Sequence, residues 1–190
     1  MTLATLAAVL AATSALGYVD FNKNGKMDPY EDPSLPREAR VRDLVSRMTL
    51  EEKAAQLSQM QVVSTSRKKE GWTDKIYAER KAAVQKGLGS LIWFDADVKG
   101  RNEWQRYAVE GTRLGIPMIF GMDIIHGDQL VFPISLGLAC AFEPELFERE
   151  QTVAAREAAA AGIDWAFAPM CDLSRDPRWG RVSETCGEDP

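Results

Sequence analysis

The chain has 190 residues, a formal net charge of −5, 45% hydrophobic residues and 27% charged residues. These values fit one soluble domain with its own core, or part of a larger domain. The mild acidity and the lack of a basic stripe argue against a nucleic-acid partner. A single histidine, His126, excludes a multi-histidine metal site, and three cysteines (140, 171 and 186) match no zinc spacing. An odd number of cysteines is a poor disulfide framework, so we expect buried free thiols.

Residues 1–17 are small and apolar, and they are too few to span a bilayer as a helix. They are similar to the apolar part of a secretory signal, with small residues near Ala12 to Ala15. The segment before the apolar run carries no lysine or arginine, unlike most signals. Two interpretations stay open, a signal peptide and an apolar N-terminal helix.

Residues 18–33 form a turn-rich segment, in which DFNKNGKMDPYE (20–31) fits the EF-hand calcium loop. Gly25 takes the sharp-turn position, and Met27 is expected to be an apolar anchor. Pro29 within the loop, Pro33 soon after it and the lack of a second loop argue against an ion, and the alternative is an Asx-rich turn with no ion. We interpret the segment as a single calcium loop with a structural role. The predicted calcium ligands are Asp20, Asn22, Asn24, Lys26 through its carbonyl group, Asp28 and Glu31.

Two helices are predicted next. An apolar stripe of Val41, Leu44, Val45 and Met48 indicates the first. Thr49 and Glu52 form a capping-box pattern that opens the second, which we expect to continue past Leu57. Residues 66–75 are typical of an exposed loop, and a helix near 75–86 should end at Gly87.

Three apolar runs of strand length then alternate with helical segments. The runs are residues 88–94, 116–123 and 163–172, and the helices are 101–113 and 142–162. This alternation predicts βαβ units and a parallel sheet. The runs are nearly continuous in apolar residues, which is typical of strands covered on both faces. The many charges of the 142–162 helix indicate a solvated face.

Polar residues gather where the predicted strands end. DIIHGDQ (123–129) follows the second run, and CDLSRDPRWGR (171–181) follows the third. Ligands of parallel α/β folds bind at the carboxyl ends of the strands. The sequence therefore predicts a ligand site formed by these two loops.

Asp123 and His126 are candidates in the first loop. The Asp123 carboxylate could accept hydrogen bonds from neighbouring sugar hydroxyls, or it could cap a turn or pair with an arginine. His126 could orient a carboxylate or contact a ligand, or it could be purely structural.

PRWGR (177–181) is the main feature of the second loop. Guanidinium groups bind carboxylates and donate to hydroxyls with defined geometry. Asp176, Glu184, Glu188 and Asp189 are nearby acidic partners. The alternative is a salt-bridged loop that closes the end of the sheet, and we expect one arginine to be structural and the other to face ligand.

The chain resembles the N-terminal domain of glycoside hydrolase family 3, the β-glucosidase family, over about residues 18–190. The resemblance rests on several stretches in order: EDPSLPREARVRDLVSRMTLEEKAAQL, RLGIPMIFGMDIIHG, VFPISLGLA and AAAAGIDWAFAPMCDLSRDPRWGRVSETCGEDP. It implies that residues 34–190 are the first part, about three βα units, of a (β/α)8 TIM-type barrel that is incomplete at its C-terminal end. It also implies retaining hydrolysis of terminal β-linked glucosides or related sugars.

The resemblance also implies roles for single residues. Asp123 and Arg181 would bind the sugar in the −1 subsite, and the scaffold around them would be His126, Asp172, Arg178 and Glu184. The catalytic carboxyl groups would lie beyond this chain, which as a truncated piece would be inactive alone. We expect no catalytic cofactor, a structural calcium ion, an oligosaccharide or β-glucoside partner, no nucleic acid, no membrane span, and a periplasmic or secreted location. The alternative is a non-catalytic calcium-loop module for carbohydrate binding or interaction.

Overall fold

The computed structural model describes residues 17–62, 72–94 and 98–189. The chain divides into two compact units. The first, here the N-terminal unit, comprises residues up to 58 together with 79–89 and 104–118. The second, here the sheet unit, comprises residues 59–78, 90–103 and 119–190. The predicted signal segment falls almost wholly outside the described residues.

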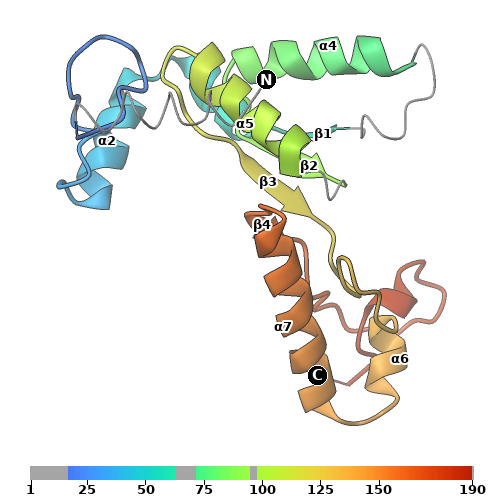
Figure 1. The fold of residues 1–190 in the computed structure, drawn as a ribbon. Coiled ribbons are helices and arrows are strands. Elements are labelled where there is room, and N and C mark those ends of the chain that lie inside the picture. The colour runs from blue at the N-terminus through green and yellow to red at the C-terminus, as the bar shows by residue number, and fades with distance from the viewer. Residues whose placement is uncertain (1–16, 63–71, 95–97, 190) are drawn as a thin grey trace. The chain divides into compact units, whose positions relative to one another are not determined.

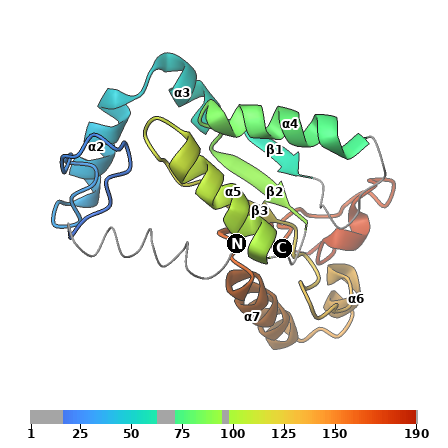
Figure 2. The ribbon, with the colours of Figure 1, turned by 45° about the horizontal axis from the view of Figure 1, so that its top comes forward.

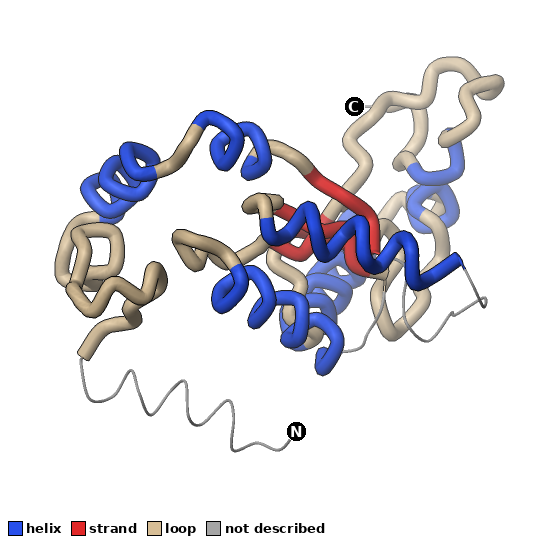
Figure 3. The backbone as a smooth tube through the Cα atoms, turned by 90° about the horizontal axis from the view of Figure 1, so that it is seen from above, coloured by secondary structure: helices blue, strands red, loops and turns tan. Residues whose placement is uncertain are grey.

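The sheet unit is built on a four-stranded parallel sheet with the strand order β1-β2-β3-β4 (Figure 1; strands are red in Figure 3). The strands are β1 (Gln59–Val62), β2 (Ser90–Trp93), β3 (Ile119–Met122) and β4 (Trp165–Ala166). Each strand pairs with its neighbour in the sequence, and Leu91 is opposite both Met60 and Phe120. The predicted parallel sheet is confirmed, with one strand more than expected.

Strand β1 corrects the predicted second helix. That helix, α3 (Leu50–Gln56), ends before Leu57 and does not continue past it. After two residues the chain enters β1, whose sequence QMQV has the alternation of a strand. A four-residue polar-apolar pattern is too short to separate from the end of a helix by periodicity alone.

The core of the sheet forms around Leu91 and Phe120, which are fully buried. The Trp93 and Phe120 rings meet edge to face with centroids 5.9 Å apart. The Arg101 guanidinium lies over the Phe120 ring at 4.7 Å. Gly121 leaves room for a ring, since a Cβ atom there would lie 2.3 Å from the Phe167 side chain.

The helices largely match the sequence pattern (Figure 2). They are α4 (Trp72–Gln85), α5 (Val98–Gly111), the unpredicted short α6 (Ser135–Ala139) and α7 (Pro144–Ala160). Gly162, which was expected to close α7, has a φ of +85° just beyond its end. The predicted 66–75 loop is wrong at its C-terminal end, because residues 72–75 form the first turn of α4. The rest of that loop lies outside the described residues.

The N-terminal unit contains α2 (Arg37–Arg47) and α3. The predicted capping box is present: the Thr49 hydroxyl accepts from the Glu52 amide at 3.2 Å, and the Glu52 carboxylate accepts from the Thr49 amide at 2.9 Å. Arg113 adds an ion pair to Glu52 at 2.6 Å. The apolar stripe of α2 is less buried than expected, since Val41 and Val45 are exposed and the helix has no buried residue.

The cysteines correct another prediction, because Cys140, Cys171 and Cys186 are all exposed. Cys140 follows the last residue of α6, and the other two lie in the long loop after β4. None is in a strand or on the buried face of a helix, where an isolated thiol would be covered. Separately, no helix in the described ranges is both long enough and apolar enough to cross a membrane.

Candidate functional site

The pairing of β3 with β4 brings the two predicted site loops together. Met122, the last residue of β3, pairs with Ala166, the last residue of β4. Asp123 is the next residue after β3, and the loop after β4 carries Asp172, Arg178 and Arg181. Both loops therefore begin at the carboxyl-terminal edge of adjacent parallel strands.

Arg181 is the cationic centre of this cluster. Its Nε and Nη2 atoms bind the Glu184 carboxylate at 2.7 and 2.5 Å. This hydrogen bond is the main cause of a raised pKa of Arg181, and the charges of Glu184, Asp123 and Asp172 raise the pKa further. The two aspartates are thus near enough to act on the guanidinium electrostatically. The structure brings together Asp123, Asp172, Arg181 and Glu184.

The carboxylates of Asp123 and Asp172 keep their acceptor capacity. Both residues are exposed, and within the described ranges neither carboxylate takes part in a hydrogen bond or a salt bridge. A carboxylate near a cation that is already bound to another acid can still accept hydrogen bonds from hydroxyl groups. This edge of the sheet can therefore offer both acceptors and a donor to a polyhydroxylated ligand.

Arg178 binds an acid outside this charge cluster. Its guanidinium binds Asp176 through Nη2 at 2.6 Å and Nε at 2.9 Å, and its side chain is 88% exposed. The pKa of Asp176 is lowered by these same bonds. Glu188 and Asp189, also considered as partners, form no ion pair in the part of the chain that the structure describes. The predicted salt-bridged loop is therefore present, with one acid for each of the two arginines.

Helix α7 holds the loop that follows Asp123, which sequence reasoning missed. Glu157 accepts from the amides of Gln129 and Leu130, both at 3.0 Å. Gln151 donates to the carbonyl of Ile125 at 3.1 Å. The charged residues of this helix were interpreted as a solvated face, and Glu157 on that helix also bonds backbone amides of another segment. No sequence signal distinguishes them, because their partners are backbone groups of another segment.

Gly127 makes the turn of that loop possible. Its φ is +111°, and a Cβ atom there would lie 1.9 Å from the Leu130 carbonyl oxygen. The His126 carbonyl accepts from the Phe132 amide at 2.8 Å on the other side of the turn. The His126 residue itself is exposed; burial raises the pKa of Glu150 on α7, and His126 offsets part of that rise.

Glu150 is a buried acid that the sequence did not single out. It is 3% exposed, and neither carboxylate oxygen has a hydrogen-bond partner among the described residues. Burial raises its pKa more than its other neighbours lower it. Ser135 at the start of α6 is also buried with an unpaired hydroxyl in the same part of the chain.

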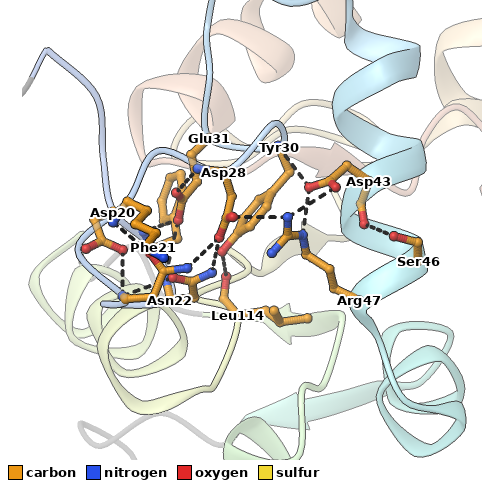
Figure 4. A network of polar contacts seen from close by, with 12 residues as sticks. Asp20, Phe21, Asn22, Asp28, Tyr30, Glu31, Asp43, Ser46, Arg47 and Leu114 are labelled. Carbon is orange, nitrogen blue, oxygen red and sulfur yellow. Dashed lines mark hydrogen bonds and ion pairs between the residues drawn. The ribbon is translucent and has the colours of Figure 1, made fainter.

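The predicted calcium loop is closed by bonds between its own carboxylates and its backbone amides (Figure 4). Glu31 is buried, and its carboxylate accepts from the amides of Phe21 at 2.7 Å and Asp28 at 2.9 Å. Asp20 accepts from the amides of Asn24 at 3.1 Å and Gly25 at 2.8 Å. Gly25 has a φ of +76°, as its sharp-turn position requires. Met27, the expected apolar anchor, is instead 51% exposed.

The other acid of that loop, Asp28, faces donors (Figure 4). The amide groups of Asn22 and Asn24 donate to it at 2.6 and 2.7 Å, and Arg47 of α2 binds it at 3.0 Å. These bonds lower its pKa, with the Asn22 bond contributing most. In the described ranges no three or more His, Cys, Asp or Glu side chains are grouped so as to hold a metal ion. In this arrangement the loop acids bind amides and a guanidinium.

Parallel strands in sequence order, with polar loops beyond their carboxyl ends, are the arrangement of the first strands of a TIM-type barrel. The pattern of the family described as "Glycosyl hydrolase family 3 N terminal domain" matches residues 49–190, and the chain belongs to this family. The predicted fold class, the first part of an α/β barrel, is confirmed.

Relatives and solved structures agree with this assignment. The chain is 37% identical to the periplasmic beta-glucosidase of Salmonella typhimurium, over 80% of this chain and 19% of that protein. It is 32% identical to the periplasmic beta-glucosidase/beta-xylosidase of Dickeya chrysanthemi, over 98% of this chain and 31% of that protein. A mutant beta-glucosidase from Listeria innocua in complex with laminaribiose is similar with a TM-score of 0.70 and 40% identity, over 82% of this chain and 22% of that one. The chain thus spans less than a third of the length of these proteins.

Proposed function

We propose that this chain forms one wall of the −1 subsite in a retaining glycoside hydrolase that removes terminal β-linked glucosyl or related residues. The observation that carries the proposal is the cluster of Asp123, Asp172 and Arg181 at the ends of two adjacent parallel strands. Membership of the family and the beta-glucosidase names of its relatives support it. The Listeria innocua protein bound to laminaribiose supports a saccharide ligand.

In this proposal Asp123 accepts hydrogen bonds from sugar hydroxyls, and Arg181 donates to an oxygen of the same ring. Glu184 fixes the direction of the guanidinium through its two contacts. His126, Asp172 and Arg178 belong to the surrounding scaffold. Such contacts accelerate the reaction where they strengthen as the ring flattens toward an oxocarbenium-like transition state.

We further propose that the two reacting carboxyl groups lie outside this chain. A retaining mechanism places a nucleophile and an acid/base about 5 to 5.5 Å apart on the two sides of the bond. Neither role is assigned to Asp123, which would bind sugar hydroxyls, or to Asp172, which belongs to the scaffold. The isolated 190-residue chain should therefore show no useful turnover.

We also propose that segment 20–31 is a structural calcium loop. The reaction itself would need no cofactor. Six oxygen donors at EF-hand spacing support the proposal: Asp20, Asn22, Asn24, the Lys26 carbonyl, Asp28 and Glu31. Calcium would have to replace the Arg47 and asparagine bonds to Asp28 and the amide bonds to Glu31. A periplasmic or secreted location, which the names of two relatives support, would expose the loop to millimolar calcium.

The subsite proposal is tested in the complete protein with an aryl β-glucoside. Asp123→Asn and Arg181→Lys should each lower kcat/KM by about 10- to 100-fold, the loss expected for one charged hydrogen bond. Glu148→Gln and Arg156→Lys, at exposed positions of α7, are matched controls that should leave kcat/KM unchanged. Unchanged values for both site variants would remove the proposal.

A further inference from the structure

We propose that Cys171 and Cys186 form a disulfide across the loop that carries Arg178 and Arg181. The two cysteines bracket this loop on either side, and both are exposed. This disulfide would change only the covalent state of the loop, whatever the loop binds.

The backbone already joins the two ends of this loop. The Ser174 amide donates to the Gly187 carbonyl at 2.9 Å. Ser174 lies three residues after Cys171, and Gly187 directly follows Cys186. Thr185, which precedes Cys186, is fully buried and bonds the Val182 carbonyl at 3.0 Å. The Gly187 amide donates back to the Thr185 hydroxyl at 3.4 Å. The position of Cys186 is therefore held by its neighbours on both sides.

The electrostatic surroundings of Cys186 include Cys171. The pKa of Cys186 is raised, first by partial desolvation and then by Cys171 and Glu150. Cys140, at the end of α6, is not among the groups that raise this pKa.

The chemistry requires an oxidant, which we take to be a small-molecule disulfide of the glutathione type. One cysteine thiolate attacks the oxidant, forming a mixed disulfide and releasing one small thiol. The second cysteine thiolate then attacks the protein sulfur of the mixed disulfide and releases the second small thiol. The protein loses two hydrogen atoms, the oxidant gains them, and the S–S bond of the oxidant is exchanged for one in the protein.

The bond would restrict the loop that holds both arginines. Oxidising compartments outside the cytosol are where such bonds form and persist. The third cysteine, Cys140, would remain a free thiol, which accounts for the odd count in the sequence.

The test is oxidation of the 190-residue chain in a glutathione buffer, followed by alkylation, tryptic digestion and mass spectrometry. Arginines at 149, 156, 175 and 181 separate the three cysteines into different peptides. We expect one linked pair of peptides containing Cys171 and Cys186, lighter than the two reduced peptides by two hydrogen atoms. Cys140 should be alkylated throughout.

The same oxidation in denaturant provides the reference. In the denatured chain, loop-closure entropy alone should make the 171–186 disulfide about three- to fivefold more abundant than the 140–171 or the 140–186 disulfide, because it closes the shortest loop. The folded chain should exceed this ratio clearly, and Cys140→Ser should leave the linked pair unchanged. Cys186→Ser should leave Cys171 open to alkylation. A folded chain with the denatured ratio of links, or with three free thiols, would overturn the proposal.

Discussion

Single residues of this chain are held in place mainly by backbone partners. Glu157 and Gln151 bond amide and carbonyl groups of the loop after β3, and Glu31 bonds amides of the 20–31 loop. Arg181 and Arg178 have each an acid within three residues. Local acid–base pairs of this kind can be expected from sequence spacing, whereas the bonds of Glu157 and Glu31 to distant amides cannot.

Glu150 gives the first stability prediction at this scale. The pKa of Glu150 is higher in the folded chain than in the unfolded chain, where a glutamate has a pKa of about 4.3. Its charged form therefore destabilises the fold at higher pH, and this cost disappears as the pH falls below that value. Glu150→Gln should stabilise the chain at pH 7 by about 1 kcal/mol, because a neutral amide is cheaper to bury than an unpaired carboxylate. Urea unfolding at pH 7 and pH 4 measures the difference.

The gain should shrink toward pH 4, where Glu150 itself becomes neutral. Glu148→Gln, two positions away and exposed, is the control and should change the urea midpoint little at either pH. A destabilised Glu150→Gln variant at pH 7 would show that the carboxylate has a partner that offsets its burial.

At the scale of elements, helix boundaries followed the sequence where a cap was present. Thr49 and Glu52 form their capping box, and Gly162 follows α7 with a positive φ. The error at β1 arose where no such signal exists, since a short strand after a helix is selected by pairing with β2. The short helix α6 was not predicted, and the predicted 163–172 run is longer than the two-residue strand β4.

The capping box predicts the cost of losing a cap. Thr49→Ala should destabilise the chain by about 1 kcal/mol, because the Glu52 amide loses its side-chain acceptor. Thr152→Ala, at an exposed position inside α7, is the matched control and should be neutral or slightly stabilising. The urea midpoints of the parent and both variants measure the difference. Equal midpoints for Thr49→Ala and the parent would mean that the cap contributes nothing measurable to stability.

The 20–31 loop predicts a measurable interaction with calcium. Calorimetric titration should show binding to the parent chain and at least tenfold weaker binding to Glu31→Gln, which loses a charged ligand. Glu38→Gln, an exposed acid of α2, should bind as the parent does. Equal binding by parent and Glu31→Gln would remove Glu31 as a ligand, and no heat in the parent would favour the ion-free turn.

The whole chain carries open sheet edges and exposed apolar side chains. In the described ranges β1 pairs only with β2, and β4 only with β3. Leu130, Val131 and Phe142 are exposed. Unpaired strand edges and apolar surface promote association. The chain spans less than a third of the length of the Salmonella typhimurium and Dickeya chrysanthemi relatives.

The isolated chain is therefore predicted to self-associate at micromolar concentration. Sedimentation velocity over a range of concentrations measures it, and Val131→Lys should shift the distribution toward monomer. Ala160→Lys, which adds the same charge at an exposed position of α7, is the control for a general effect of charge. A monomeric parent at all concentrations would contradict the prediction.

The sequence by itself determined the alternation of helices and strands, the parallel sheet and the loops that carry Asp123 and Arg181, because apolar periodicity and turn residues are local properties. It also indicated the family, through motifs in a fixed order. Only the tertiary structure decided that Asp123, Asp172 and Arg181 share one charge cluster, that α7 holds the loop after β3, and that the cysteines are exposed. Those features depend on which strand ends lie side by side and which backbone groups remain unpaired, and both follow from packing between segments far apart in the sequence.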